Sequence, residues 1–302
     1  MVTVSIIALL MGILLPALGS AKETARQTLC ASHLRQLGQA SLTYAAGHRG
    51  DYCSGPFDNR MERGYGAMDE KGWVADFVLG DYAVPGEMLC PSNPSQHCQN
   101  LILDRLNDDA FKTFTEEERD NLIARGFNTN YVQSWYMAYT GMQDNYDGGL
   151  DAKRTNGVIG PLNSRYLGDV VPSSKIPLFG DATTDLSEVI VIDGESLRTT
   201  KHLSDGPAGF DGMVWNMQSY TDFGPAHGKS GFIRLSNAQH SKLDCQMVMA
   251  DGHVESFRDT IRDGELGHEA LVENGVPRLR YDDEIEGKVF GGWLNGGGSR
   301  FR

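Results

Sequence analysis

The chain has 302 residues, a formal net charge of −13, 36 glycines and 11 prolines. The acidic balance argues against a nucleic-acid partner, because a phosphate-binding protein needs a basic patch and this sequence has none. The length allows one anchored helix and one large domain with a substantial hydrophobic core.

The first predicted element is one long helix over residues 2–44, within an N-terminal region of residues 1–47. No charged residue occurs in residues 2–18, and we expect this stretch to be a membrane helix. A cleaved secretory signal is the alternative, but no basic segment precedes the apolar run and the helical pattern continues beyond it. The residues assigned to the membrane helix are Val4, Ile6, Ile7, Leu9, Leu10, Ile13, Leu14 and Pro16.

The second half of this helix is amphipathic. Cys30, Leu34, Leu37, Ser41 and Tyr44 follow spacings of four, three, four and three residues, so they share one helix face. An isolated helix gains most of its stability from packing, and this stripe must therefore be covered. We predict that Cys30, Leu34, Leu37 and Tyr44 form the core between the helix and a sheet.

Residues 48–302 are predicted to form a globular, extracytoplasmic α+β domain. Its expected architecture is an antiparallel β-sheet with loop insertions, packed against the long helix. A second helix is expected over residues 101–125, with a capping box from Thr115 to Glu118 and a stop at Gly126. Strands are expected over residues 131–139, 158–159, 176–179, 188–193, 232–235 and 289–294.

The segment from Gln246 to Phe257 is predicted to be a β-hairpin. Two β-type runs flank Asp251 and Gly252, the pair favoured in a two-residue type I′ turn. Both residues tolerate the positive φ that this turn requires. A turn is therefore the first interpretation of the pair, ahead of a metal or catalytic role.

Two groups of residues are candidates for binding a metal ion. Asn145, Asp147 and Asp151 lie in a segment that resembles part of a calcium loop, although Arg154 stands where a distal glutamate is expected. The simpler interpretation is a solvated turn. His240, Asp251 and His253 form the second group if the preceding loop folds back. Calcium is the candidate ion for these two groups, and the sequence establishes no cofactor.

The chain has five cysteines, Cys30, Cys53, Cys90, Cys98 and Cys245. If the others form disulfides, an odd number leaves at least one thiol free or paired with another chain. The spacing favours a disulfide between Cys90 and Cys98, with Cys53–Cys90 as the next pair. Zinc binding by Cys90, His97 and Cys98 with Cys53 is the alternative. Cys30 is interpreted as a small core residue.

The opening MVTVSIIALLMGILLPALGSAKETAR resembles the start of type IV pilin-like proteins and type II secretion pseudopilins. In that family a short leader precedes a phenylalanine, an apolar run and a glutamate. The resemblance therefore implies that these features are encoded upstream of Met1.

A narrower resemblance is to prepilin-like proteins with a DUF1559-type domain. It rests on CASHLRQLGQASLTYAAGHRGDY, on the run from Cys90 to Ser92, on Val171 to Asp181, and on His240 with Asp251 to Val254. Residues 259–302 match no pattern that we can name.

The resemblance implies a non-enzymatic subunit that anchors once in the bacterial inner membrane. Its domain is expected in the periplasm or on an extracellular filament of the type II secretion or type IV pilus class. Partners would be like subunits, met through the helix, and the secretion or pilus assembly machinery. The alternative is a membrane-anchored binding module that presents Trp73, Trp135, Trp215 or tyrosines to a carbohydrate or surface ligand. A hydrolase is disfavoured, because no G-x-S-x-G motif occurs.

Overall fold

The computed structural model describes residues 2–63, 65–142, 158–168, 171–204, 207–208, 217–228, 242–273, 276–281 and 284–294. The helices are α1 (Val2–Gly47), α2 (Trp73–Leu79), α3 (Leu103–Leu106) and α4 (Glu116–Ala124). The strands are β1 (His97–Cys98), β2 (Tyr131–Gln133), β3 (Gly141–Met142), β4 (Val158–Ile159), β5 (Pro177–Asp181), β6 (Thr184–Ile192), β7 (Glu195–Thr200), β8 (Pro207–Ala208), β9 (Met217–Gln218), β10 (Asp244–Met249), β11 (Val254–Arg258), β12 (His268–Glu273) and β13 (Val276–Tyr281).

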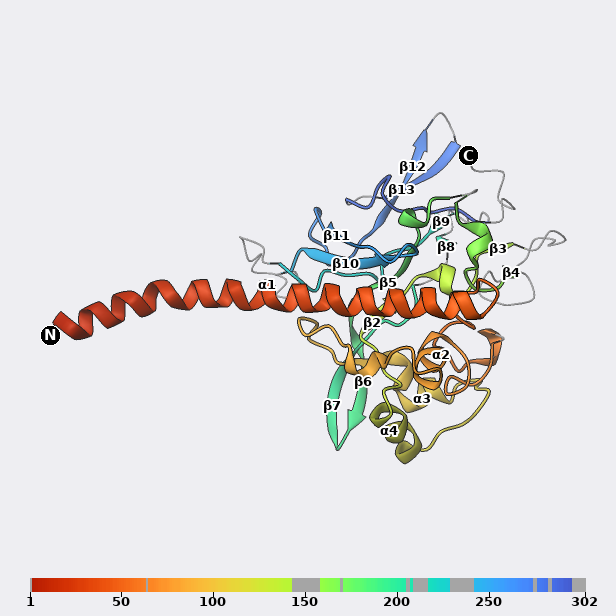
Figure 1. Ribbon diagram of the computed structural model, residues 1–302, viewed down its shortest axis with the longest axis horizontal. Helices are drawn as coiled ribbons and strands as arrows, with labels where there is room; N and C mark the ends of the chain where they lie inside the picture. The colour runs from red at the N-terminus through yellow and green to blue at the C-terminus, as the bar shows by residue number, and fades with distance from the viewer. Residues whose placement is uncertain are drawn as a thin grey trace.

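Helix α1 is the longest element and organises the molecule (Figure 1). Its second half runs across the body, with β5, β10 and β11 on one side and α2 to α4 on the other. Its first half extends away from the domain. The predicted α+β fold, with a long helix on an antiparallel sheet, is confirmed.

The central sheet has the strand order β11-β10-β5-β2, and every pair in it is antiparallel. Alternate residues of β10 point to opposite faces. Val248 belongs to the same hydrophobic cluster as the α1 stripe, whereas Met247 and Met249 belong to a second cluster on the far face. Both faces of β10 are therefore covered, which explains why this strand is buried almost throughout.

A glycine lets α1 approach the sheet closely. A Cβ built on Gly38 would lie 2.5 Å from Cγ2 of Val248 and 3.7 Å from the Cα of Gly252. The first distance is shorter than any van der Waals contact, so a larger residue at this position would push the helix away. Gly38 thus fixes where the β10–β11 hairpin packs on α1.

The helical region predicted over residues 101–125 is interrupted. The structure contains α3 and α4 with a loop between them, so the prediction of one continuous helix is wrong. The capping box is confirmed: Thr115 Oγ1 accepts a hydrogen bond from Glu118 N at 3.2 Å, and Thr115 N donates to Glu118 Oε2 at 2.8 Å. The capping signal therefore marked the start of α4 rather than the middle of a longer helix.

Some of the other predicted strands are formed and others are not. Residues 158–159 form β4, and β2, β5 and β6 overlap three further predicted runs. Residues 232–235 lie outside the described residues. Residues 289–294 do not form a strand; instead Phe290 N donates to Lys175 O and Leu294 N to Thr140 O, each as a single loop contact. Among the strands of the described residues, β1 pairs with β7 in parallel orientation.

Candidate functional site

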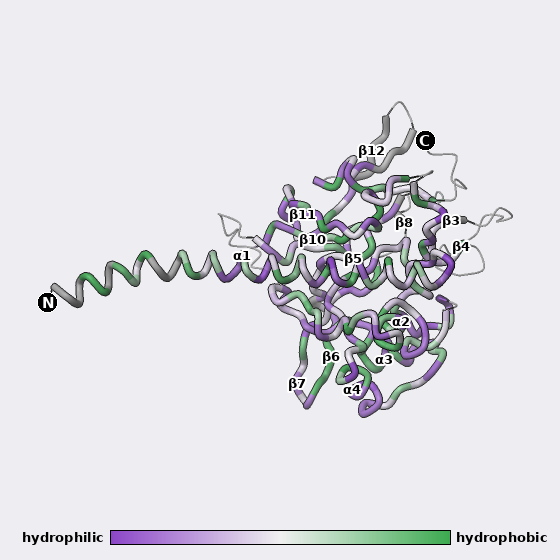
Figure 2. The backbone as a smooth tube through the Cα atoms, viewed as in Figure 1, coloured by the Kyte–Doolittle hydropathy of each residue, from purple (hydrophilic) through white to green (hydrophobic). Residues whose placement is uncertain are grey.

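The first half of α1 presents apolar side chains to the surroundings. Within the described part of the chain, no helix combines the length and the apolarity that a bilayer crossing requires. The side chains of Val4, Leu9, Leu14 and Pro16 lie outside the described residues. Figure 2 shows the apolar colouring of the extended helix. Six large side chains here are 51–67% exposed: Ile6, Ile7, Leu10, Met11, Ile13 and Leu18.

The predicted stripe on the second half of α1 lies in the core. Cys30, Leu34, Leu37 and Ser41 are fully buried, and Tyr44 is nearly so. Ser41 Oγ donates a hydrogen bond to Tyr52 O at 2.8 Å, which satisfies the buried serine hydroxyl in this largely apolar row. The stripe packs on the sheet and thereby attaches the extended half of the helix to the domain.

The predicted hairpin is formed, but its turn type differs from the prediction. Met249 N donates to His253 O, and Gly252 N donates to Met249 O. Gly252 has φ +85°, whereas Asp251 is not among the residues with positive φ. The prediction of a two-residue type I′ turn is therefore wrong. The loop is a three-residue connection in which a type I turn is followed by a left-handed glycine.

Asp251 and His253 lie together at this turn. Asp251 Oδ1 accepts from His253 N at 3.1 Å and contacts His253 Nδ1 at 2.5 Å. Both side chains are more than one-third exposed, so the pair belongs to the surface. His240, the third member of this predicted group, lies outside the described residues, as do Asn145, Asp147 and Asp151 of the predicted calcium loop.

A substitution at Gly252 tests this turn. We expect Gly252→Val to lower the free energy of unfolding by about 1–2 kcal/mol, because a β-branched residue resists the left-handed conformation. Asp251→Asn is the matched control and should change the free energy by less than about 0.5 kcal/mol, since an exposed pair contributes little. Urea unfolding of both variants measures the difference. Equal effects would contradict the assignment of the strained position to Gly252.

The five cysteines are all unpaired and all buried. Neither predicted disulfide, Cys90–Cys98 or Cys53–Cys90, is formed. The predicted zinc group of Cys53, Cys90, His97 and Cys98 does not assemble either. Among the described residues, the one group of three or more potential metal ligands contains Cys90 with three partners from elsewhere in the chain.

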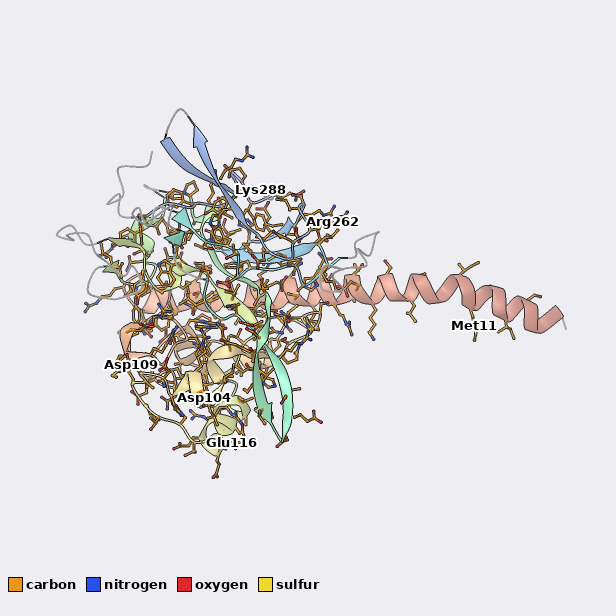
Figure 3. The ribbon with its side chains drawn as sticks, turned by 180° about the vertical axis from the view of Figure 1, so that it is seen from behind. Met11, Asp104, Asp109, Glu116, Arg262 and Lys288 are labelled. Carbon is orange, nitrogen blue, oxygen red and sulfur yellow. The ribbon has the colours of Figure 1, made fainter. Side chains whose placement is uncertain are left out.

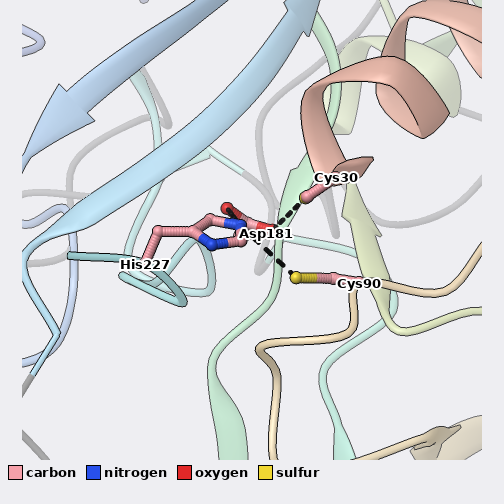
Figure 4. A group of neighbouring side chains, drawn as sticks. All are labelled: Cys30, Cys90, Asp181 and His227. Atoms are coloured by element: carbon pink, nitrogen blue, oxygen red, sulfur yellow. Dashed lines mark hydrogen bonds and ion pairs between the residues drawn. The ribbon is translucent and has the colours of Figure 1, made fainter. Parts of the chain in front are cut away.

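The members of this group are Cys30, Cys90, Asp181 and His227, and we call it the Cys–Asp–His cluster (Figure 4). Cys30 comes from α1, Asp181 from the last position of β5, and Cys90 and His227 from loops. Sγ of Cys30 donates to Asp181 Oδ1 at 3.2 Å, and Sγ of Cys90 lies 3.4 Å from His227 Nε2. Nε2 of His227 also lies 3.5 Å from Asp181 Oδ2. All four side chains are fully buried.

The cluster perturbs the ionisation of its members. A hydrogen bond from Cys30, together with the contact to His227, lowers the pKa of Cys90 to about 4. Burial raises the pKa of Cys30 and of Asp181 well above their usual ranges. Burial alone would lower the pKa of His227, but the hydrogen bond with Cys90 and the charge of Asp181 raise it. The arrangement therefore favours the thiolate form of Cys90 and the protonated form of His227.

Sequence reasoning found parts of this cluster but did not assemble it. Cys30 was assigned to the core stripe, Cys90 to a disulfide, and Asp181 only to the resemblance. His227 was missed because it lies in the glycine- and proline-rich interval of residues 204–229, which has no regular pattern. The one available signal was chemical: cysteine, histidine and aspartate are the side chains that bind transition metals.

No family model, curated protein or solved structure matches the chain.

Proposed function

We propose that this protein is a non-enzymatic, pilin-like or pseudopilin-like subunit that anchors in the bacterial inner membrane through α1 and assembles into a filament. Its domain would lie in the periplasm or on the extracellular filament. The observation that carries the proposal is the row of large apolar side chains exposed along the first half of α1. Fully burying one such side chain is worth about 1.5–3 kcal/mol, so a cover of lipid or of like helices is strongly favoured.

The continuity of α1 supports a filament over a solitary anchor. The helix runs without interruption from Val2 to Gly47, so its exposed half and its buried half form one rigid rod. Packing of the exposed halves of several subunits would therefore place their domains in a regular array. A solitary anchor needs no such rigid connection and is commonly joined to its domain by a flexible linker.

The exposed half also has room for a neighbouring helix. A Cβ built on Gly12 would meet no atom within 4 Å, so the subunit's own fold does not require glycine there. Small residues at helix interfaces let two backbones approach closely, which stabilises helix bundles in lipid.

The alternative is a carbohydrate-binding module, but two of its three candidate tryptophans are inaccessible to a ligand. Trp73 and Trp135 are buried, and the Trp73 ring lies 4.4 Å from that of Phe179 in the core. Trp215 lies outside the described residues. No described feature favours this alternative.

Cross-linking tests the proposed assembly. Met11 and Ile13 are both exposed, and two residues turn a helix by about 200°, so they face opposite sides. All five native cysteines are buried, so a bifunctional thiol reagent would act on introduced cysteines. We expect the double variant Met11→Cys/Ile13→Cys to give a ladder of oligomers in cells that make the full chain.

Asp104 and Glu116 provide the control positions for this experiment. Both are exposed, and Figure 3 shows them in the domain, far from Met11. The double variant Asp104→Cys/Glu116→Cys should give far less cross-linked product. Monomers from both variants, or equal ladders from both, would overturn the proposal that subunits associate through the exposed helix.

A further inference from the structure

The Cys–Asp–His cluster has the dimensions of a tetrahedral metal site. All its potential ligand atoms lie within 4.8 Å of one another. The bond lengths of zinc to sulfur, nitrogen and oxygen give a tetrahedron with edges of roughly 3.3–3.8 Å. The contacts of 3.2, 3.4 and 3.5 Å within the cluster are close to those edges, the first at Oδ1 and the last at Oδ2 of Asp181. Movements of up to roughly 1 Å would therefore let the four side chains surround one ion.

A second observation comes from the other nitrogen of His227. Its Nδ1 is buried and has no hydrogen-bond partner, but it faces Glu23 Oε1 at 3.7 Å. Glu23 is held in place by Lys242 at 2.6 Å and by Ser92 at 3.2 Å. A histidine that binds a metal through one nitrogen usually donates its other N–H to a carboxylate, which fixes the ring. Glu23 is placed for this role, because its Oε1 faces Nδ1 and would need to approach by only a few tenths of an ångström to accept the hydrogen bond.

Burial argues against a cysteine nucleophile. In a catalytic Cys–His–carboxylate arrangement, the cysteine and the carboxylate lie at different nitrogens of the imidazole, and Cys90 and Glu23 are placed in this way around His227. However, none of the four side chains of the cluster is accessible to solvent, so a substrate has no route to Cys90. Asp181 also approaches Nε2, on the same side of the ring as Cys90, where a metal ion would lie.

We propose that Cys30, Cys90, Asp181 and His227 bind one zinc ion as a closed structural site. Two thiolates with an imidazole favour zinc over calcium or magnesium, which prefer oxygen ligands. Four protein ligands leave no open position, as in structural rather than catalytic zinc sites. The ion replaces the protons of these groups and neutralises negative charge that is otherwise costly to bury.

The position of the site gives it a mechanical role. Among the α1 residues whose side chains are described, Cys30 is the first fully buried one, and it lies near the point where the helix leaves the domain. The other ligands lie in the central sheet and in the loops beside it. A bound ion therefore joins the extended helix to the domain at the point where a pull on the helix acts. This inference does not depend on the proposed function.

The test uses the reduced full chain in detergent, loaded with zinc and freed of excess metal. We expect about one zinc per chain, and removal of zinc by a chelator should lower the Tm. Reloading with cobalt should produce a thiolate-to-cobalt charge-transfer band and the intense visible absorption of a tetrahedral ion. Cys90→Ser should lose the bound metal, the cobalt bands and the Tm shift.

Cys98→Ser is the matched control, because Cys98 is equally buried, lies eight residues further along the chain and is outside the cluster. It should keep all three signals. Glu23→Gln leaves the four ligands in place and should weaken zinc affinity by about 10–100-fold, measured by competition with a chromogenic chelator. Because its ligands are intact, this variant remains informative if Cys90→Ser does not fold.

Three outcomes would overturn the zinc site. The first is a folded, reduced wild-type chain that binds no zinc and gives no cobalt bands. The second is equal binding by Cys90→Ser and Cys98→Ser. The third is a Cys30–Cys90 disulfide in protein isolated from cells under alkylating conditions, because the two sulfurs would then be unable to bind the ion.

Discussion

Leu34→Asp should lower the free energy of unfolding by about 3–5 kcal/mol. Leu34 lies on the buried face of α1 and is fully buried in the hydrophobic cluster that includes Val248 of β10. The substitution removes apolar contacts and places a carboxylate among them, where neither water nor a counter-ion can reach it. Urea unfolding of the domain, followed by circular dichroism, measures the loss.

Gln39→Asp is the control for this experiment, because it introduces the same residue into the same helix at an exposed position. Its effect should be limited to the lower helix propensity of aspartate, below about 1 kcal/mol. Leu37→Asp should behave like Leu34→Asp, since Leu37 is also fully buried. If all three variants were equally stable, α1 would not pack on the sheet through this face.

Asp58→Ala should lower the free energy of unfolding by about 3–5 kcal/mol. Asp58 is buried and lies 2.7 Å from Arg60 Nη2 and 3.1 Å from Arg63 Nε. Arg63 is itself largely buried, with its guanidinium 5.7 Å from the centre of the Trp135 ring. Removing the carboxylate leaves the positive charge of the arginines in the interior without its nearest counter-ion. The resulting loss of stability is larger than the net stabilisation that the ion pair itself provides.

Glu62→Ala is the matched control, because Glu62 contacts the same two arginines from a more exposed position. It lies 3.5 Å from Arg60 Nη1 and 4.0 Å from Arg63 Nη2. Its loss should cost about 0–1 kcal/mol. Similar effects of the two substitutions would show that the arginines are stabilised by solvent rather than by Asp58.

The cost of losing Asp58 should depend on pH. Burial opposes ionisation of Asp58, but the contact with His202 and the hydrogen bonds from Arg60 outweigh it and hold the pKa well below its usual value. A carboxyl group of this kind stabilises the fold above its unfolded pKa of about 4, and the contribution is lost as the pH falls through the folded pKa. The difference in the free energy of unfolding between wild type and Asp58→Ala should therefore have its full size at pH 7 and become smaller below pH ~4. Urea unfolding of both proteins at several pH values measures this difference.

The features that the sequence determined by itself are those encoded in neighbouring residues. The stripe on α1 follows from helical spacing, and the start of α4 follows from the capping box at Thr115. The hairpin of β10 and β11 follows from a β pattern on both sides of a turn pair. In each case the residues that interact lie within a few positions of one another, so the pattern can be read along the chain.

The type of the β10–β11 turn was decided by the tertiary structure. Ala250 N donates to Ile176 O at 2.8 Å, and Tyr52 Oη donates to Ala250 O at 3.0 Å. These contacts bind Ala250 to the segment before β5 and to the loop after α1, which favours the longer turn. An Asp-Gly pair alone could not distinguish the two turn types, because both place glycine at a left-handed position.

The Cys–Asp–His cluster was also decided by the tertiary structure. Cys30 and Asp181 are 151 positions apart, and Cys90 and His227 are 137 positions apart. No spacing rule connects residues at such distances, and the short interval between Cys90 and Cys98 instead suggested a local disulfide. Packing of α1 on β5 brings Cys30 to Asp181, and the loops that carry Cys90 and His227 meet them there. Local patterns therefore defined the helix and the hairpin, whereas the long-range packing of α1 on the sheet assembled the cluster.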